Sequence, residues 1–146
     1  MLAACRNDQD EMLEDIFKEG DFDINHQDGL GDSALHYAAR FGSLTCLEIL
    51  VRVPGIDINI QNKLGNTPLL LAMQYEDDPE VALSIVDVLL DSGADPRMEN
   101  KQKQSAKSLV ENRTDDMKDL IEQAIAGYEM GTSSDDDDEG QFSDAI

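Results

Sequence analysis

Apolar residues recur every three or four positions in three parts of the chain, which is the spacing that places them on one face of an α-helix. The clearest stretch runs from Val81 to Leu90, where Leu83, Val86, Leu89 and Leu90 form one stripe. Similar stretches run from Leu44 to Val51 and from Met117 to Tyr128. The pattern therefore predicts three amphipathic helices, the last of which closes the fold.

A shorter helix is predicted ahead of each of the first two. Ser33 and Thr67 stand where a helix needs an N-cap, and Pro68 follows directly, at the position where a missing N–H costs nothing. Small residues such as Ala38 and Ala72 come next, which lets a neighbouring helix approach closely. The chain should thus fold as pairs of helices.

The pairs repeat with a fixed period. Residues 31–38 (GDSALHYA) return 34 positions later as residues 65–72 (GNTPLLLA), and residues 23–25 (DIN) return as residues 57–59. A period in this range is typical of a stack of like units, each of which buries its apolar face against its neighbours.

The motif resembles the ankyrin repeat, whose pattern is Gly-x-Thr-Pro-Leu-His-x-Ala, followed by Leu-Leu-x-x-Gly-Ala-Asp. The second part stands intact at residues 89–95 (LLDSGAD), and the chain is also similar to small fungal ankyrin-only proteins. The resemblance implies an all-α solenoid of helix-turn-helix units with short β-hairpin connections, made of two full repeats and two capping units. The extended segment 57–61 (DINIQ) is expected to form one arm of a hairpin.

We expect an ankyrin-repeat domain over residues 1–128, with units at about 1–27, 28–61, 62–99 and 100–128. The first unit lacks its opening turn, which favours a trimmed N-terminus or an abrupt cap. The last unit has Lys103 at the Gly position and Lys107 at the buried Leu position, as a polar terminal cap would. The spacing from Gly65 to Lys103 is 38 residues, so an acidic insertion is expected at residues 76–80, either as a plain surface bulge or as an acidic contact beside Tyr75.

The charge is strongly negative, with a formal net charge of −21. This argues against direct binding to nucleic acid or to an anionic membrane and favours a basic protein partner. No apolar run is long enough to span a membrane, and no signal sequence opens the chain, so a cytoplasmic and also nuclear location is expected, with the protein monomeric on its own.

Residues 129–146 have the composition of a disordered acidic tail. Its carboxylates are expected either to contact the basic partner and speed its capture or only to solubilise the protein. Ser133 and Ser134 each precede an acid by three positions, which makes them candidate phosphorylation sites. The tail carboxylates in question are Asp135, Asp136, Asp137, Asp138 and Glu139.

Nothing in the sequence predicts an enzyme, a cofactor or a metal site. His36 occupies the His position of the repeat, where the resemblance implies a hydrogen-bonding role, and Leu70 replaces it in the next unit. His26 is expected on a hairpin, and Cys5 and Cys46 are expected to be buried structural thiols in a reducing compartment. No nucleophile with a base and an orienting partner can be named.

The resemblance implies that a partner meets the concave face, which is built from hairpin tips and the exposed positions of the first helices. Three aromatic residues on this face, Tyr37, Phe41 and Tyr75, are either contacts for the partner or packing for adjoining helices. The full set of candidate partner-binding residues is Tyr37, Arg40, Phe41, Leu71, Gln74, Tyr75, Asp28, Leu30, Lys63, Leu64, Asn112 and Arg113.

The function predicted from these patterns is a non-enzymatic protein–protein interaction module. Its more specific form is an escort that holds a basic client, such as a ribosomal, translation-related or other nucleic-acid-binding protein, similar to dedicated ankyrin-type chaperones. The alternative is an adaptor or an inhibitor of an enzyme or regulatory complex, in which the tail only aids solubility. Steep dependence of binding on salt separates the two.

Overall fold

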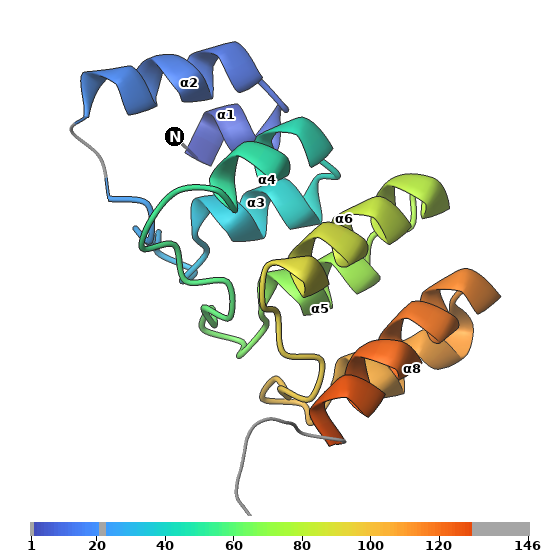
Figure 1. The fold of residues 1–146 in the computed structure, drawn as a ribbon. Coiled ribbons are helices and arrows are strands. Elements are labelled where there is room, and N and C mark those ends of the chain that lie inside the picture. The colour runs from blue at the N-terminus through green and yellow to red at the C-terminus, as the bar shows by residue number, and fades with distance from the viewer. Residues whose placement is uncertain (1, 21–22, 130–146) are drawn as a thin grey trace, which may run out of the picture.

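The computed structural model describes residues 2–20 and 23–129, and these residues form a solenoid of paired helices (Figure 1). The helices in chain order are α1 (Leu2–Arg6), α2 (Asp10–Glu19), α3 (Ala34–Arg40), α4 (Leu44–Leu50), α5 (Pro68–Met73), α6 (Pro79–Asp91), α7 (Ala106–Leu109), the 3₁₀ turn η1 (Val110–Asn112) and α8 (Asp115–Glu129). The all-helical fold predicted from the repeat pattern is confirmed.

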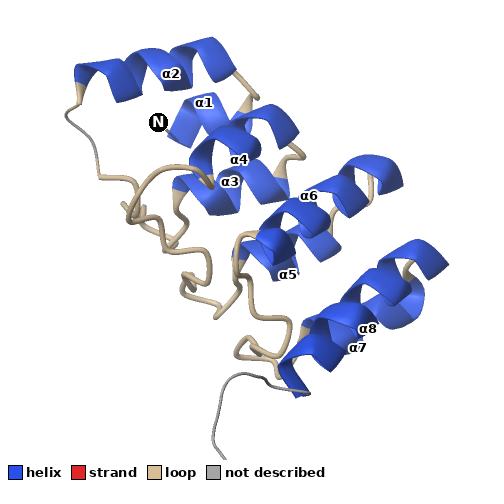
Figure 2. Cartoon of the chain, viewed as in Figure 1, coloured by secondary structure: helices blue, strands red, loops and turns tan. Residues whose placement is uncertain are grey.

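The helices lie in two layers. The first-helix layer consists of α1, α3, α5 and α7, in which each helix packs against the next, and the second-helix layer consists of α2, α4, α6 and α8, packed in the same order (Figures 1 and 2). Within each pair the two helices are antiparallel neighbours joined by a short turn. Because contacts run only to adjacent units, the apolar core is a continuous band between the layers.

Side chains at the helix starts explain where the helices begin. Ser33 caps α3 in a reciprocal capping box with His36, and Thr67 caps α5 by accepting a hydrogen bond from the backbone N–H of Leu70. Asp78 caps α6, and its carboxylate accepts from two backbone N–H groups of the first turn. The predicted helix from Val81 to Leu90 therefore begins two residues earlier, at Pro79.

The expected β-hairpins are wrong in detail, because none of the described residues lies in a β-strand (Figure 2). In the predicted hairpin arm, the backbone N–H of Asn59 donates to the carboxylate of Asp57, and Asn25 and Asp23 make the same contact one repeat earlier. Such Asx turns fold the Asp-Ile-Asn segment back on itself, and the loops are held by side chains instead of a backbone ladder.

Residues 74–78 form the loop between α5 and α6, so residues 76–78 of the expected insertion lie between the two helices of its unit, whereas Pro79 and Glu80 belong to the first turn of α6. The last unit also departs from the others where expected. Lys103 adopts a left-handed backbone with φ 64°, and Lys107 is exposed on α7.

Candidate interaction surface

Polar side chains join each loop to the next one along the stack. Asn25 donates to the carbonyl of Gly55 and accepts from the backbone N–H of Asp57, while Asn59 repeats both bonds toward Gly93 and Asp95. These bonds span the connection between repeats, so the two asparagines hold the loops in register.

A second pair of side chains adds to these bonds, and the two sets together form a loop ladder, in which each loop is hydrogen-bonded to the next. Gln27 donates through Nε2 to the carbonyls of Gly31 and Gln61, at 2.7 Å and 3.0 Å, and Gln61 makes the equivalent bonds to Gly65 and Glu99. The loops are therefore rigidly positioned, and they carry their tips outward from the first-helix layer.

Leucines lie at these tips. Leu30 and Leu64 are 66% and 64% exposed, which makes them the most exposed large apolar side chains described. Their backbones are fixed by neighbours, because the carbonyls of Leu30 and Leu64 accept hydrogen bonds from the N–H groups of Lys63 and Lys101 in the following loops. Both leucines were predicted as contact residues, and both are available on the surface.

Tyr37 and Asp28 form the polar edge of this surface. The Tyr37 hydroxyl donates a hydrogen bond to the carboxylate of Asp28, whose other oxygen accepts from the backbone N–H groups of Leu30 and Asp32. The bond from Tyr37 is the main reason why the pKa of Asp28 lies below its ordinary value and the pKa of Tyr37 above its own. Asp28 is thus a charged anchor for the tip that carries Leu30.

Arg6, Tyr37 and Phe41 form a cluster on the first-helix layer. The rings of Tyr37 and Phe41 are stacked, with centroids 6.1 Å apart, and the guanidinium carbon of Arg6 lies 5.1 Å from the centroid of Phe41. Phe41 remains 39% exposed. A cation over an aromatic ring and an exposed ring edge together offer contact area of the kind that dominates protein interfaces.

Arg40 has a structural role. Its guanidinium lies 2.7 Å from a carboxylate oxygen of Asp32, which is fully buried, and the side-chain amide of Asn62 donates to the other oxygen of Asp32. A buried carboxylate needs such partners, because an unpaired buried charge is costly. Arg40 therefore fixes a loop, and its contact with a partner stays a prediction.

Two predicted contact residues lie differently from expectation. Leu71 is only 6% exposed and belongs to the core, since the neighbouring first helices cover it. The ring of Tyr75 lies against Gly42, because a Cβ built on Gly42 would lie 2.6 Å from Cζ, the ring carbon that bears the Tyr75 hydroxyl. The prediction that Leu71 contacts a partner is thus wrong, and Tyr75 packs against the preceding unit, as the alternative for the aromatic residues proposed.

The other predicted residues of this surface divide between exposed and engaged positions. Gln74 and Lys63 are exposed. Arg113 donates to the carbonyl of Met73 and lies 3.4 Å from the carboxylate of Glu76, so it ties the last unit to the insertion loop. Asn112 is the last residue of η1. The tail residues Ser133, Ser134, Asp135, Asp136, Asp137, Asp138 and Glu139 lie outside the described residues.

Charge is separated between the two layers, which the sequence reasoning missed. In the second-helix layer α2 carries five carboxylates, α4 one, α6 three and α8 five, against the two bases Lys18 and Lys118. The helices of the first-helix layer carry no carboxylate and three bases, Arg6, Arg40 and Lys107. Counting charges helix by helix, rather than along the chain, would have found this signal.

A groove lies between α6 and α8 in the second-helix layer. Its volume is about 320 Å³, and its lining combines Leu83 and Leu120 with the carboxylates of Asp87, Asp116 and Asp119. Among the residues that the structure describes, none of those lining it is basic. The groove therefore offers apolar contact inside a strongly negative field.

His36 and the two cysteines belong to the scaffold. Burial is the main reason why the pKa of His36 lies below its ordinary value, and the imidazole joins Ser33 to the carbonyl of Asn66. Burial likewise raises the pKa of Cys5 and of Cys46 to about 12, which leaves both thiols protonated and unreactive at neutral pH.

Within the described part of the chain, no group of three or more His, Cys, Asp or Glu side chains is arranged to hold a metal ion. Over the same residues, no helix has the length and hydropathy required to cross a membrane.

Comparison with known proteins identifies the repeat. A model of ankyrin repeats in three copies matches residues 1–100. An ankyrin repeat-containing protein of Saccharomyces cerevisiae is 32% identical over 157 residues, covering 99% of this chain and 87% of the yeast protein. The putative ankyrin repeat protein YahD of Escherichia coli is 30% identical over 112 residues, covering 77% of this chain and 55% of its own.

A mouse relative, ankyrin repeat domain-containing protein 37, is 47% identical over 53 residues, covering 36% of this chain and 33% of the mouse protein. The names of these relatives describe the repeat and give no catalytic activity. Ankyrin repeats are protein–protein interaction modules that generally have no catalytic role. The repeat pattern, the paired helices and the matches together show that the chain belongs to the ankyrin-repeat family.

Proposed function

We propose that this protein is an escort for a basic client protein, in which the second-helix layer supplies the negative field and the first-helix layer supplies apolar contacts. The observation that carries the proposal is the separation of charge between the layers, since nearly all helical carboxylates lie on one of them. A one-sided field attracts and orients a basic partner more strongly than scattered charges do.

The groove between α6 and α8 is the proposed contact point for the client's basic side chains. Lysine and arginine carry long apolar stems below a charged head. In this groove the stem would lie along Leu83 and Leu120, and the head would reach Asp87, Asp116 or Asp119. The tail carboxylates 135–139 are proposed to extend the same field and to speed association.

Apolar contact is proposed to come from the exposed residues Phe41, Leu30 and Leu64 on the first-helix layer. The two leucines are rigidly mounted, because their carbonyls accept hydrogen bonds from the following loops, and Phe41 is held at the C-cap of α3, where its N–H donates to the carbonyl of Tyr37. Rigid mounting lowers the entropy lost on binding. A client that wraps the edge of the stack would meet both layers.

A specific observation also favours the alternative, an adaptor or inhibitor that binds only through the first-helix layer. The exposed apolar residues and the Arg6–Phe41 contact lie on the layer whose helices carry no carboxylate. A partner bound there would have little need of the acidic layer, and the carboxylates would serve solubility.

Binding measurements with layer-specific variants test the proposal. Partners are captured from a lysate of the source cells with the full chain, identified, purified and titrated at rising salt. If the escort proposal holds, the partner is basic, and its affinity falls about 10-fold or more between low and physiological salt. The double variant Asp87→Asn with Asp119→Asn should lower that affinity further.

The matched control is Glu11→Gln with Glu14→Gln, which removes two exposed carboxylates from α2, at the other end of the same layer. It should weaken binding less than the groove variant if the groove is the contact point. An affinity that does not change with salt or with either pair of acid substitutions, yet is lost in Phe41→Ala, would refute the escort proposal and support the adaptor proposal.

A further inference from the structure

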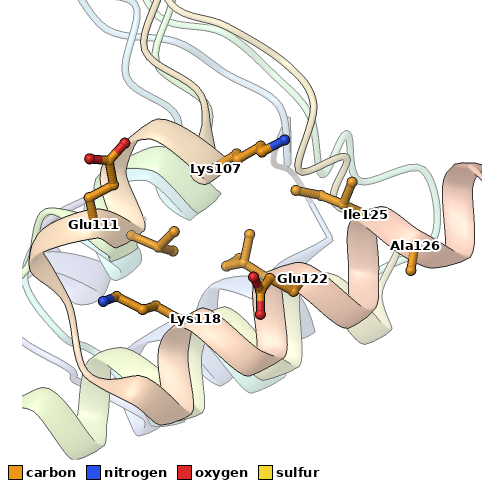
Figure 3. A pocket seen from close by; sticks show the side chains of 8 residues that line it. Lys107, Glu111, Lys118, Glu122, Ile125 and Ala126 are labelled. Atoms are coloured by element: carbon orange, nitrogen blue, oxygen red, sulfur yellow. The ribbon is translucent and has the colours of Figure 1, made fainter.

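The last repeat unit ends in an open groove. Its volume is about 570 Å³, and its apolar lining is formed by Val110 on the turn η1 and by Ile121, Ile125 and Ala126 on α8 (Figure 3). Val110 and Ile121 are only 7% and 0% exposed, so the apolar surface open to an occupant belongs mainly to the half-buried Ile125 and to Ala126. In every earlier unit the next pair of helices covers the corresponding face. After α8, the described part of the chain offers no further helix to cover this one.

Charged residues stand around this groove. Lys107 and Lys118 line it together with Glu111 and Glu122, and Figure 3 shows the lysines on opposite sides of the apolar centre. Over residues 2–20 and 23–129, neither lysine has a carboxylate within ion-pair distance. The exposed Lys101 and Lys103 add two more positive charges to the same unit.

The remainder of the chain has the complementary chemistry. Residues 130–146 contain six carboxylates and no base, and they contain one aromatic residue, Phe142, three positions after the acidic run 135–139. This order places an apolar side chain within about 10 Å of the nearest carboxylate of the run, Glu139, at the rise of an extended chain. The groove likewise has lysines beside its apolar residues.

We propose that the C-terminal tail of this protein folds back onto its own last repeat, with the Phe142 ring in the groove of Val110, Ile121 and Ile125 and the acidic run beside the lysines of that unit. The docked tail takes the place of the missing next repeat. The acidic run 135–139 is also the one that the escort proposal directs toward the client, so the groove and the client would compete for it, but the contact with the groove needs no client.

The length of the tail permits this arrangement. Helix α8 ends at Glu129, and Ile125 and Ile121 lie about 6 Å and 12 Å back along its axis at 1.5 Å per residue. The thirteen residues from 130 to 142 can span up to about 43 Å when extended. A return path along α8 therefore needs only a fraction of the available reach.

The covalent tether favours the tail over a second copy of the folded domain as occupant. A second copy would bring its own acidic second-helix layer toward a protein that is already strongly negative. The tail is tethered, so its effective concentration at the groove is high and the contact forms within one molecule.

Paramagnetic relaxation measured by NMR on the full chain tests the proposal. A nitroxide is attached at Gly140→Cys, which reacts selectively because Cys5 and Cys46 are buried with raised pKa values. We expect the methyl signals of Val110, Ile121 and Ile125 to broaden several-fold more than those of Leu13, which is buried at the other end of the stack.

The tail variant Phe142→Ser, carried in the same labelled chain, should abolish this selective broadening, and raised salt should reduce it. The matched control Ile146→Ser alters the other large apolar residue near the end of the tail and should retain it. Equal broadening at Leu13 and Ile125, or none at Ile125, would overturn the proposal. Broadening that disappears on dilution of labelled into unlabelled protein would assign the groove to a second copy and also overturn it.

Discussion

The Nε2 atom of His36 lies 2.8 Å from the carbonyl oxygen of Asn66, in the following repeat. On the other side of the ring, the backbone N–H of Ser33 donates to Nδ1 of His36, so Nδ1 is the acceptor and Nε2 the donor. The imidazole thus closes the capping box of α3 and at the same time joins two repeats. A neutral ring satisfies both bonds, whereas a protonated ring loses the acceptor at Nδ1.

Acid should therefore destabilise the protein through His36. Burial holds the folded pKa of His36 below its ordinary value of 6.5, so the unfolded chain binds more protons between the two pKa values. The contribution of His36 to the free energy of unfolding is then fully present above pH 6.5 and is lost as the pH falls from 6.5 through the folded pKa. Denaturant unfolding at pH 7, 6 and 5 measures this loss.

The variant His36→Leu, which copies Leu70 of the next repeat, should cost about 1–3 kcal/mol at pH 7 because it leaves buried groups unpaired. It should also flatten the dependence of stability on pH between 7 and 5. The exposed His26 provides the control, since His26→Gln leaves the buried imidazole in place and should keep the slope. An unchanged slope in His36→Leu would show that other groups cause the loss.

Alanine substitutions at Gly31 and Gly55 distinguish the cost of backbone strain from the cost of steric overlap. Both glycines are left-handed, with φ of 82° and 85°, but a Cβ at Gly31 would lie 2.7 Å from the backbone nitrogen of Lys63, while a Cβ at Gly55 would meet nothing within 4 Å. Gly55→Ala should cost about 1–2 kcal/mol of strain. Gly31→Ala should cost clearly more, because the Lys63 loop must also move. Similar midpoints for both variants in denaturant unfolding would contradict the close packing of these loops.

Lys103 should gain stability when changed to glycine. It has φ 64° at the position of Gly31 and Gly65, and no later loop presses against it within the described residues. The substitution removes the strain of a left-handed lysine, so Lys103→Gly should raise the free energy of unfolding by about 1 kcal/mol. Lys101→Gly, at an exposed neighbour, serves as control and should not stabilise. A loss of stability in Lys103→Gly would show that the lysine side chain has a structural role.

The hydroxyl of Tyr37 should control the acidity of Asp28. Tyr37→Phe removes the hydrogen bond that contributes most to lowering the pKa of Asp28, so this pKa should rise toward its ordinary value of 3.8. Carboxyl NMR titration of both proteins measures the change. Asp23, whose carboxylate accepts from the backbone N–H of Asn25, is the internal reference, because the Tyr37 hydroxyl bonds to Asp28. An Asp28 titration that is identical in the variant would disprove the link.

The sequence could predict the repeat, the helix pairs and the buried roles of His36 and the cysteines, because each depends on a local pattern. It could not predict that Leu71 is buried, because this depends on how closely adjacent helices approach. The charge separation between layers was missed for a similar reason, since carboxylates that are spread evenly along the chain gather on one layer only after the helices pair. Candidate contact residues were thus found where they stand on loop tips and missed or misassigned where stacking decides exposure.

The residues that form the loop ladder change in the third loop, where the ladder ends. In the third loop, the position of Asn25 and Asn59 is occupied by Arg97, which bonds to Asp95 of its own loop. The position of Gln27 and Gln61 is occupied by Glu99, whose carboxylate has no N–H to donate to a next loop. Over the described residues, the loop ladder thus ends at Arg97 and Glu99, which do not repeat the bonds that Asn59 and Gln61 make to the next loop. An engineer who wished to insert further units after residue 99 would begin by restoring asparagine and glutamine there.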